Sequence, residues 1–307
     1  MPFVIPKGWG KPIYDFSKNP LTKEGFELGR HLFYDPILSS DNTISCASCH
    51  LQATGFTHVD HDLSHGIDGI IGTRNSMTIM NLAWSHSFMW DGSINHLDMQ
   101  PLAPLSNSVE MGENLENVLK KINSSTKYKT LFYKAFDDSL ATGQRTLLAF
   151  SQFILQLNSY NSKYDKYMRK EVGGEYNQQE INGLQLFRIH CVSCHTEPLF
   201  TNNNFENNGL PIDTTLNDFG RVKITHNPAD SLKFKVPTLR NIQFTYPYMH
   251  DGRFKKLREV LNYYTTTRQL TPPIILNADE KVDIIAFLLT LTDYEFLFDK
   301  QFGYPRE

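Results

Sequence analysis

The four cysteines of this 307-residue sequence occur as two copies of one short motif. Each copy holds two cysteines separated by two residues and followed at once by a histidine: Cys46, Cys49 and His50, then Cys191, Cys194 and His195. Two thiols three positions apart on a helical turn can each add to one vinyl group of a haem, and the adjacent imidazole can then bind the iron. The motifs therefore predict two covalently attached haem c groups, with His50 and His195 as proximal ligands.

Other uses of paired cysteines fit this pattern less well. A thioredoxin-type redox pair lies in a strand–turn–helix context, which neither motif has. A single zinc site usually brings its cysteine pairs much closer together in sequence, and two disulfides would not require a histidine after each pair. Because haem is usually attached outside the cytoplasm, the motifs also predict an exported, periplasmic protein, although residues 1–15 lack the charged and apolar regions of a signal peptide.

The composition excludes several classes of protein. Hydrophobic residues make up 40% of the chain and charged residues 21%, which is typical of a soluble globular protein with a substantial core. The net charge of −3 gives no general basic surface, so we expect no nucleic-acid partner. No apolar run reaches the roughly 18 residues that a membrane span requires.

The surroundings of the first motif recur around the second. Shared landmarks recur in the same order before and after the two cysteine pairs: Gly29 and Gly183, Phe56 and Phe200, Arg74 and Arg240, Asp91 and Asp251. This repeat predicts a mostly α fold of two cytochrome c-like domains, residues 1–165 and 166–307. The boundary is expected near residues 160–174, where polar residues and a Gly-Gly pair interrupt the helical pattern.

Apolar residues recur with helical spacing in residues 115–122, 128–135 and 282–289. Asn277 and Glu280 are placed to form a capping box before the last of these helices. Residues 55–73 and 202–237 are long and rich in turn formers, and we expect them to wrap the haem edges, with a short hairpin among them.

With these motifs in hand, the chain resembles the bacterial di-haem cytochrome c peroxidase family, including its MauG-type branch, from about residue 21 to residue 291. The stretches that carry the resemblance are residues 45–50, 72–76, 88–92, 100–111, 234–241 and 247–252. The resemblance implies an oxidoreductase of the cytochrome-c peroxidase type. It also implies that the first domain carries the peroxidatic haem and the second the electron-transfer haem.

The resemblance also implies roles for single residues. Glu110 matches the distal acid–base carboxylate, Gln100 its pocket partner, and Pro104 the proline packed over the same haem. Trp90 matches the indole that relays electrons between the haems. A carboxylate above the iron is suited to moving the peroxide proton from the inner oxygen to the outer one, so that water leaves.

A calcium ion between the haems is a further implication of the resemblance. Its ligands would be the side chain of Asn75 and the carbonyl oxygens of Thr245 and Pro247. Amide and carbonyl oxygens are hard donors of the kind that calcium prefers.

One departure from the peroxidase pattern concerns the second haem. Many family members carry a methionine as its second axial ligand, where this chain has Tyr264, the residue of the MauG-type enzymes. The expected helix places Tyr264 on its apolar face and Tyr263 on another face. A phenolate stabilises ferric or higher iron, whereas a thioether favours ferrous iron. Met249 is the alternative ligand.

A second departure concerns the first haem. Some family members have a distal histidine that blocks this iron until the other haem is reduced, and Ile67 fills that position here. We therefore predict an open iron and no need for reductive activation. Three nearby histidines are alternative ligands: His58, His61 and His65.

Three functions are consistent with the sequence. The first is a peroxidase that reduces hydrogen peroxide to water with electrons from a small c-type cytochrome or cupredoxin. The second is a MauG-type oxidase that uses peroxide to oxidise aromatic residues of a partner protein. The third is a di-haem electron carrier without peroxide chemistry. The sequence leaves the electron donor and the oligomeric state open.

Overall fold

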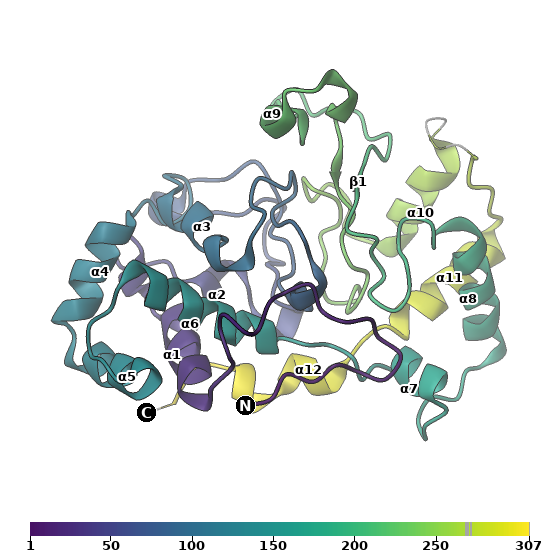
Figure 1. Ribbon diagram of the computed structural model, residues 1–307. Helices are drawn as coiled ribbons and strands as arrows, with labels where there is room; N and C mark the ends of the chain where they lie inside the picture. Colours follow the sequence, from purple (N-terminus) through teal and green to yellow (C-terminus); the bar gives the residue numbers. More distant parts are fainter. Residues whose placement is uncertain (268–269, 271, 307) are drawn as a thin grey trace.

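The computed structural model describes residues 1–267, 270 and 272–306, and these residues form a mostly helical protein with a single small hairpin (Figure 1). The helices of the first half are α1 Lys23–Tyr34, α2 Cys46–Cys49, α3 Leu102–Ser106, α4 Leu115–Ser124, α5 Thr126–Phe136 and α6 Gly143–Gln156. Those that follow are α7 Lys163–Arg169, α8 Gln178–His190, α9 Val222–Thr225, α10 Leu257–Thr266, α11 Ala278–Leu289 and α12 Tyr294–Phe298. The two strands are β1 Phe205–Glu206 and β2 Phe234–Lys235.

Each half is built around two helices that cross at a glycine. In the first half α1 packs on α6, and a Cβ atom at Gly29 would lie 2.0 Å from the carbonyl oxygen of Ala149. In the second half α8 packs on α11, and a Cβ atom at Gly183 would lie 1.9 Å from the carbonyl oxygen of Asp283. Both helix pairs approach so closely that no larger residue fits. This matching architecture confirms the mostly α, cytochrome c-like fold that the repeat predicted.

The hydrophobic core follows the two halves, with one exception at the C-terminus. The second-half core centres on Phe187, Phe200 and Phe287. Helix α12 instead packs on the first half, where the Phe296 ring lies 5.7 Å from the ring of Phe56. Figure 1 shows α12 running beneath the first-half helices, with the C-terminus close to α1. The division at residue 165 remains a prediction.

The expected helices are present with small differences at their ends. Helices α4, α5 and α11 cover the periodic segments, and Asn277 and Glu280 form the expected capping box. The interval around the expected boundary also contains α7, which begins at a capping box made by Ser162 and Asp165. Seven residues show too few periodic positions for sequence reasoning to separate this helix from a loop.

The expected hairpin is formed by β1 and β2, which pair in antiparallel fashion. The two strands enclose a long loop, residues 207–233, which carries α9 and is called the excursion below; it lies at the top of Figure 1. Arg221 ties this excursion to the first half, because its guanidinium lies 3.8 Å from the Phe205 ring centroid and donates to the carbonyl oxygen of Asp91 at 2.9 Å. Among the described residues, no helix is long and apolar enough to cross a bilayer.

Candidate haem sites and active site

Both cysteine pairs lie where a helical turn brings two thiols to one side. The first pair forms α2, which begins after a capping box between Ser45 and Ser48. The second pair follows directly on the end of α8, at Cys191 and Cys194. All four thiols are free. The disulfide alternative therefore has no support in the structure, and the thiols are available for bonds to haem vinyl groups.

The two motif histidines have the same hydrogen bond. The Nδ1 atom of His50 lies 2.8 Å from the carbonyl oxygen of Phe56, and Nδ1 of His195 lies 3.1 Å from that of Phe200. A carbonyl oxygen only accepts, so each Nδ1 carries the proton and each Nε2 keeps its lone pair for a metal. Phe56 and Phe200 have φ angles of +59° and +54°, which helps turn their carbonyl groups back toward the imidazoles.

Burial lowers the pKa of both His50 and His195 below the usual range, which favours the neutral imidazole that an iron requires. The second motif also borders a cavity of about 720 Å³, a size within the range of cofactor sites. Cys191, Cys194 and His195 form part of its wall. The residues present therefore fit a covalently bound haem at this position.

The structure brings Tyr264 to the same cavity. Its side chain lines the wall together with His195, and burial raises the pKa of its hydroxyl to about 12. Tyr263 is not one of the residues that line this cavity, and its hydroxyl donates to the carbonyl oxygen of Asn208 at 3.2 Å. Met249 also lines the cavity, and its sulfur lies 3.5 Å from the side-chain nitrogen of Asn208. Both predicted second ligands are therefore in the second haem site.

Glu110 lies at the first motif. It follows α3 in a turn in which the Asn107 amide donates to Glu110 Oε1 at 2.9 Å. Burial raises the pKa of Glu110, and the Asn107 hydrogen bond offsets only part of that effect. The pKa of the Cys49 thiol is raised to about 11, mainly by burial and next by the nearby charge of Glu110. The carboxylate therefore acts electrostatically on the first haem attachment site.

Pro104 lies beside the turn that carries Glu110, and Gln100 lies beside the turn that carries Trp90. Pro104 lies within α3, and its carbonyl oxygen accepts from the Met111 amide at 3.2 Å, which closes the turn that carries Glu110. The side-chain nitrogen of Gln100 lies 3.9 Å from the sulfur of Met89. The structure thus joins Gln100 to the turn that carries Trp90.

Trp90 is buried between the two halves. Its Nε1 donates to the carbonyl oxygen of Asn75 at 2.8 Å, and its side chain forms part of the wall of the second haem cavity. The indole lies 6.5 Å from the ring of His250, edge to face, and His250 stacks on Phe234 at 3.7 Å. The backbone N–H of Lys235 donates to the Trp90 carbonyl oxygen at 2.7 Å. Residues of both halves therefore fix the indole beside the second haem site.

The three residues of the expected calcium site border the same cavity. The Asn75 side-chain amide lies 2.5 Å from the carbonyl oxygen of Pro247, and Thr245 also lines the cavity wall. The oxygen and nitrogen of an Asn amide exchange places by a simple flip. With the amide oxygen turned toward the Pro247 carbonyl, two hard donors would face one point, which fits calcium.

A set of buried charges at this site was not assigned from the sequence. Arg74 donates to Asp91 and to Asp218, each at 2.6 Å, and so joins the Trp90 turn to the excursion of the second half. Lys235 is buried in the cavity wall and donates to the carbonyl oxygen of Ser87 at 2.5 Å. Burial lowers the pKa of Lys235 to about 8. Arg74 was visible as a repeat landmark, but no sequence signal identified its partners.

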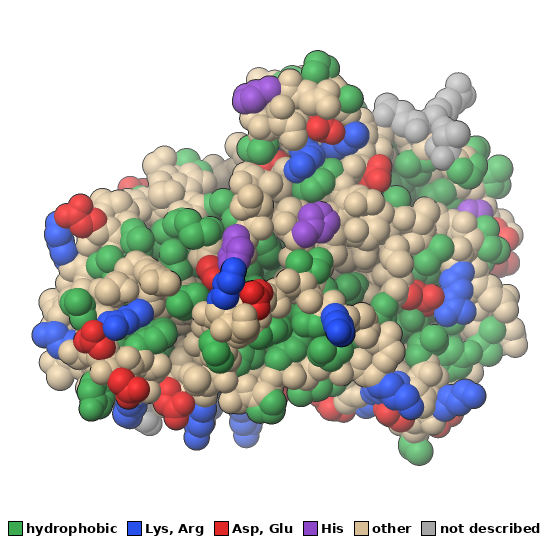
Figure 2. All heavy atoms as spheres, in the orientation of Figure 1, with side chains coloured by type: hydrophobic (Ala, Val, Ile, Leu, Met, Phe, Trp, Pro, Cys, Tyr) green, Lys and Arg blue, Asp and Glu red, His purple; other side chains and the backbone are tan. Residues whose placement is uncertain are grey.

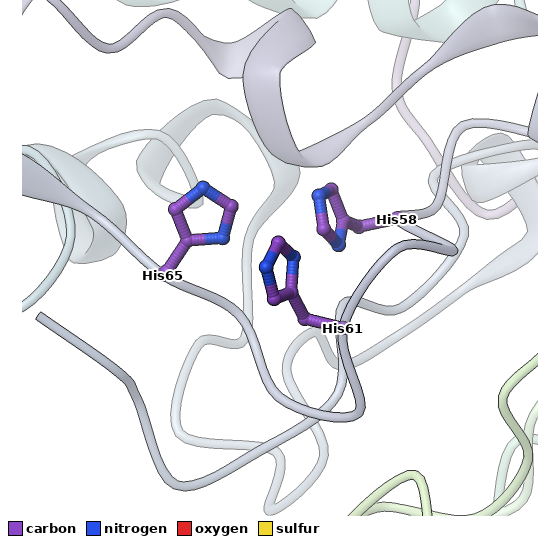
Figure 3. Close-up of side chains that lie close together, drawn as sticks. All are labelled: His58, His61 and His65. Atoms are coloured by element: carbon purple, nitrogen blue, oxygen red, sulfur yellow. The ribbon is translucent and has the colours of Figure 1, made fainter. Parts of the chain in front are cut away.

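The three histidines of residues 55–73 converge on one another rather than lying apart (Figure 3). Ile67 lies next to the turn that carries Glu110, where its N–H donates to the carbonyl oxygen of Glu110 at 2.8 Å. The aliphatic side chain of Ile67 offers no donor to iron. The open first iron remains a prediction.

Together the fold and the sites define a di-haem c-type cytochrome with a partly buried carboxylate at one haem site and a tyrosine at the other. A family model described as di-haem cytochrome c peroxidase matches residues 23–173. The chain is 36% identical over 270 residues to cytochrome c551 peroxidase of Nitrosomonas europaea, covering 87% of this chain and 79% of that protein. It is 31% identical over 294 residues to the methylamine utilization protein MauG of Methylorubrum extorquens, covering 89% and 79%.

The chain is also similar to proteins of known structure. A crystal structure of a MauG-like protein associated with microbial copper homeostasis superposes with a TM-score of 0.90 at 30% identity, over 99% of each chain. The diheme peroxidase BthA of Burkholderia thailandensis shares the fold, with a TM-score of 0.80 at 22% identity over 94% of this chain and 91% of that one. The chain belongs to the di-haem cytochrome c peroxidase family, and it is an oxidoreductase with two haem c groups.

Proposed function

We propose that this protein is a periplasmic peroxidase that reduces hydrogen peroxide to water with electrons from a small c-type cytochrome or cupredoxin. The observation that carries the proposal is Glu110, a partly buried carboxylate with a raised pKa beside the first motif. Burying a carboxylate without a cationic partner costs stability. An electron carrier has no use for such a group, whereas a peroxidase needs it.

The balanced reaction takes up one peroxide, two protons and two electrons and releases two waters. When bound, the haem held by His50 supplies the iron at which the peroxide reacts. Glu110 accepts the proton of the inner peroxide oxygen and returns it to the outer oxygen, which leaves as water. The Asn107 amide holds Glu110 Oε1 in place for both transfers. Pro104 and Gln100 shape the pocket around the reacting oxygen atoms.

In this proposal, residues 1–165 carry the peroxidatic site and residues 166–307 carry the electron-transfer site, whose haem iron would be held by His195 and Tyr264. Trp90 passes electrons from the second site to the first, which suits its position in the cavity wall and its fixed orientation. Calcium bound by Asn75, Thr245 and Pro247 would hold the two halves together next to this indole, because Asn75 also accepts from Trp90 Nε1.

Tyr264 favours a second candidate function. A phenolate ligand stabilises oxidised iron, which suits an enzyme that stores oxidising equivalents for use on a partner protein. The chain is also 30% and 31% identical to proteins described as MauG-like and MauG. The second candidate is therefore a MauG-type oxidase of aromatic residues in a partner protein.

Peroxide addition to the as-isolated protein separates these functions. One equivalent of peroxide should change the haem spectrum at once, and an excess of reduced cytochrome c should then be oxidised over many turnovers. An unchanged spectrum would identify an electron carrier. A spectral change without turnover of any small donor would favour the MauG-type reaction. Mass spectrometry of a co-purified partner would then show oxidised aromatic residues.

A further inference from the structure

Three histidines of the first half form a compact cluster of nitrogen donors. His58, His61 and His65 each offer one ring nitrogen, and these three atoms lie within 4.8 Å of one another. The His61 and His65 ring centroids are 4.7 Å apart, and the other two pairs of rings are each 5.1 Å apart. Figure 3 shows the three rings, carried by one folded loop, directed toward a shared space.

Two of these rings have a buried Nδ1 nitrogen that makes no hydrogen bond to the described residues. The Nδ1 atoms of His58 and His65 are shielded from solvent and have no partner among the described residues. The whole His58 residue is only 5% exposed. A buried imidazole nitrogen without a partner is costly, so its place in a folded protein calls for a ligand that the protein atoms do not supply.

The loop that carries the cluster is held at both ends. Thr57, next to His58, pairs with Leu51 in an antiparallel bridge. His65 pairs with Ile71 in a second bridge, and the neighbouring Ser64 N–H donates to the carbonyl oxygen of Arg74 at 2.9 Å. His58 and His65 are therefore positioned by the backbone before any ligand binds, which lowers the cost of binding one.

We propose that His58, His61 and His65 bind one zinc or copper ion, at a site separate from the two haem irons. Three imidazole nitrogens with no carboxylate among them suit these late first-row metals and not calcium or magnesium. Metal–nitrogen bonds of about 2.0–2.1 Å in a tetrahedral site place the nitrogens about 3.4 Å apart. Small side-chain rotations that bring the three nitrogens closer would therefore complete the site. Because His61 is exposed, the ion can enter from solvent and keep one position for water.

The position of the site gives the ion a structural consequence. The His65 carbonyl oxygen lies 3.4 Å from Cys49 Sγ, at the first haem attachment site. On the other side of the loop, Asp62 pairs with Lys255 of the second half at 3.1 Å, and its backbone packs against Gly252, where a Cβ atom would lie 2.1 Å from the Asp62 carbonyl oxygen. An ion held here would fix the segment that contacts both the first haem site and the second half.

The experiment uses the mature protein with both haems attached. Metal analysis should find one zinc or copper per chain in addition to two irons. After removal of that ion with a chelator, titration with zinc and, separately, with copper(II) should restore one equivalent. His61→Asn and His65→Asn should each weaken binding by at least about 100-fold, since even the loss of an outer partner of a ligand costs 10–100-fold. His61 is exposed, so its replacement leaves the core intact.

His226→Asn is the matched control, because His226 is an exposed histidine outside the cluster, at a positive φ of 54° that Asn tolerates. It should bind the ion as the wild type does. Failure of the wild-type protein to bind either ion, or equal affinity in the cluster variants, would overturn the proposal. It would also be overturned if the cluster variants changed a haem from low-spin to high-spin without losing affinity for zinc or copper, because a histidine of the cluster would then be a haem ligand. None of these outcomes depends on peroxidase activity.

Discussion

Replacing Glu110 with Gln should separate the proposed catalytic role of this residue from its effect on stability. The substitution keeps the shape of the side chain and its contact with Asn107 but removes the group that accepts a proton. A positioned acid–base is worth about 10²–10⁴ in rate. That loss corresponds to about 2.7–5.4 kcal/mol of activation free energy for the reaction with peroxide.

The raised pKa of Glu110 predicts how both the peroxide reaction rate and the stability of the fold change with pH. Burial raises the pKa of Glu110 above its ordinary value of 4.5, and only the carboxylate can accept the peroxide proton. The rate of the wild-type protein should therefore fall as the pH drops through that raised pKa, and the variant should lack this acidic limb. The folded state holds this proton more tightly than the unfolded state, so its stability falls as the pH rises from 4.5 through the raised pKa. Above that window, Glu110→Gln should be more stable than the wild type.

Stopped-flow mixing with peroxide across a pH series measures the first effect, and denaturant titration at matched pH measures the second. Glu116→Gln is the control, because Glu116 is exposed and pairs with Lys120, one turn further along α4. The control should retain wild-type rates. If Glu110→Gln reacts with peroxide as fast as this control, the assignment of Glu110 as the proton carrier is refuted.

Three further substitutions test other parts of the structure. Tyr264→Phe should change the optical and magnetic spectrum of one haem only, whereas an unchanged spectrum would shift the assignment to Met249. Asp218→Asn should destabilise the protein by about 1.5–3 kcal/mol in a denaturant titration, because Arg74 loses a charged hydrogen-bond partner and keeps only its pair with Asp91. The folded state lowers the pKa of Asp218 below 3.8, so this difference should be complete above pH 3.8 and should shrink progressively as the pH falls from 3.8 toward the lowered pKa. Phe296→Ala should cost about 3–5 kcal/mol if α12 is part of the first-half core.

The haem attachment sites and the repeated fold were predictable because their signals are local in sequence. The cysteine spacing and the following histidine define one helical turn, and the paired glycines mark the close helix crossings. The orientation of His50 follows from a turn six residues later, which the sequence marked only as a shared phenylalanine. Local patterns of this kind are preserved when the chain folds, so reading them required no knowledge of tertiary contacts.

The charges around the sites were not predictable because their partners are far apart in sequence. Arg74 and Asp218 are separated by 144 residues, and the turn-rich segment that holds Asp218 gave no periodic signal. The three histidines were noticed as alternative haem ligands, but only the folded loop shows that their rings face one another. The net charge of −3 predicted that the protein has no general basic surface. In agreement, Figure 2 shows acidic and basic side chains intermingled over the visible face.

Lys235 provides a test of how the second cavity is filled. Its ammonium is buried, its nearest polar partners are the carbonyl and hydroxyl oxygens of Ser87, and burial lowers its pKa to about 8. A buried cation without a carboxylate destabilises a protein, so its replacement by an apolar residue should then stabilise the fold. A haem carries propionate groups, and one of them beside Lys235 would supply the missing anion.

The sign of the stability change in Lys235→Met therefore reports on the position of the propionate. If a propionate of the second haem pairs with Lys235, the variant leaves a buried anion unpaired, and the mature protein should lose about 3 kcal/mol of stability. If no propionate reaches Lys235, the same variant should be more stable than the wild type, because a desolvated charge has been removed. Lys233→Met is the matched control, since Lys233 is partly exposed and pairs with Asp230 at 3.2 Å. Denaturant titration of the three mature proteins at pH 7 distinguishes the two arrangements by direction and not only by size.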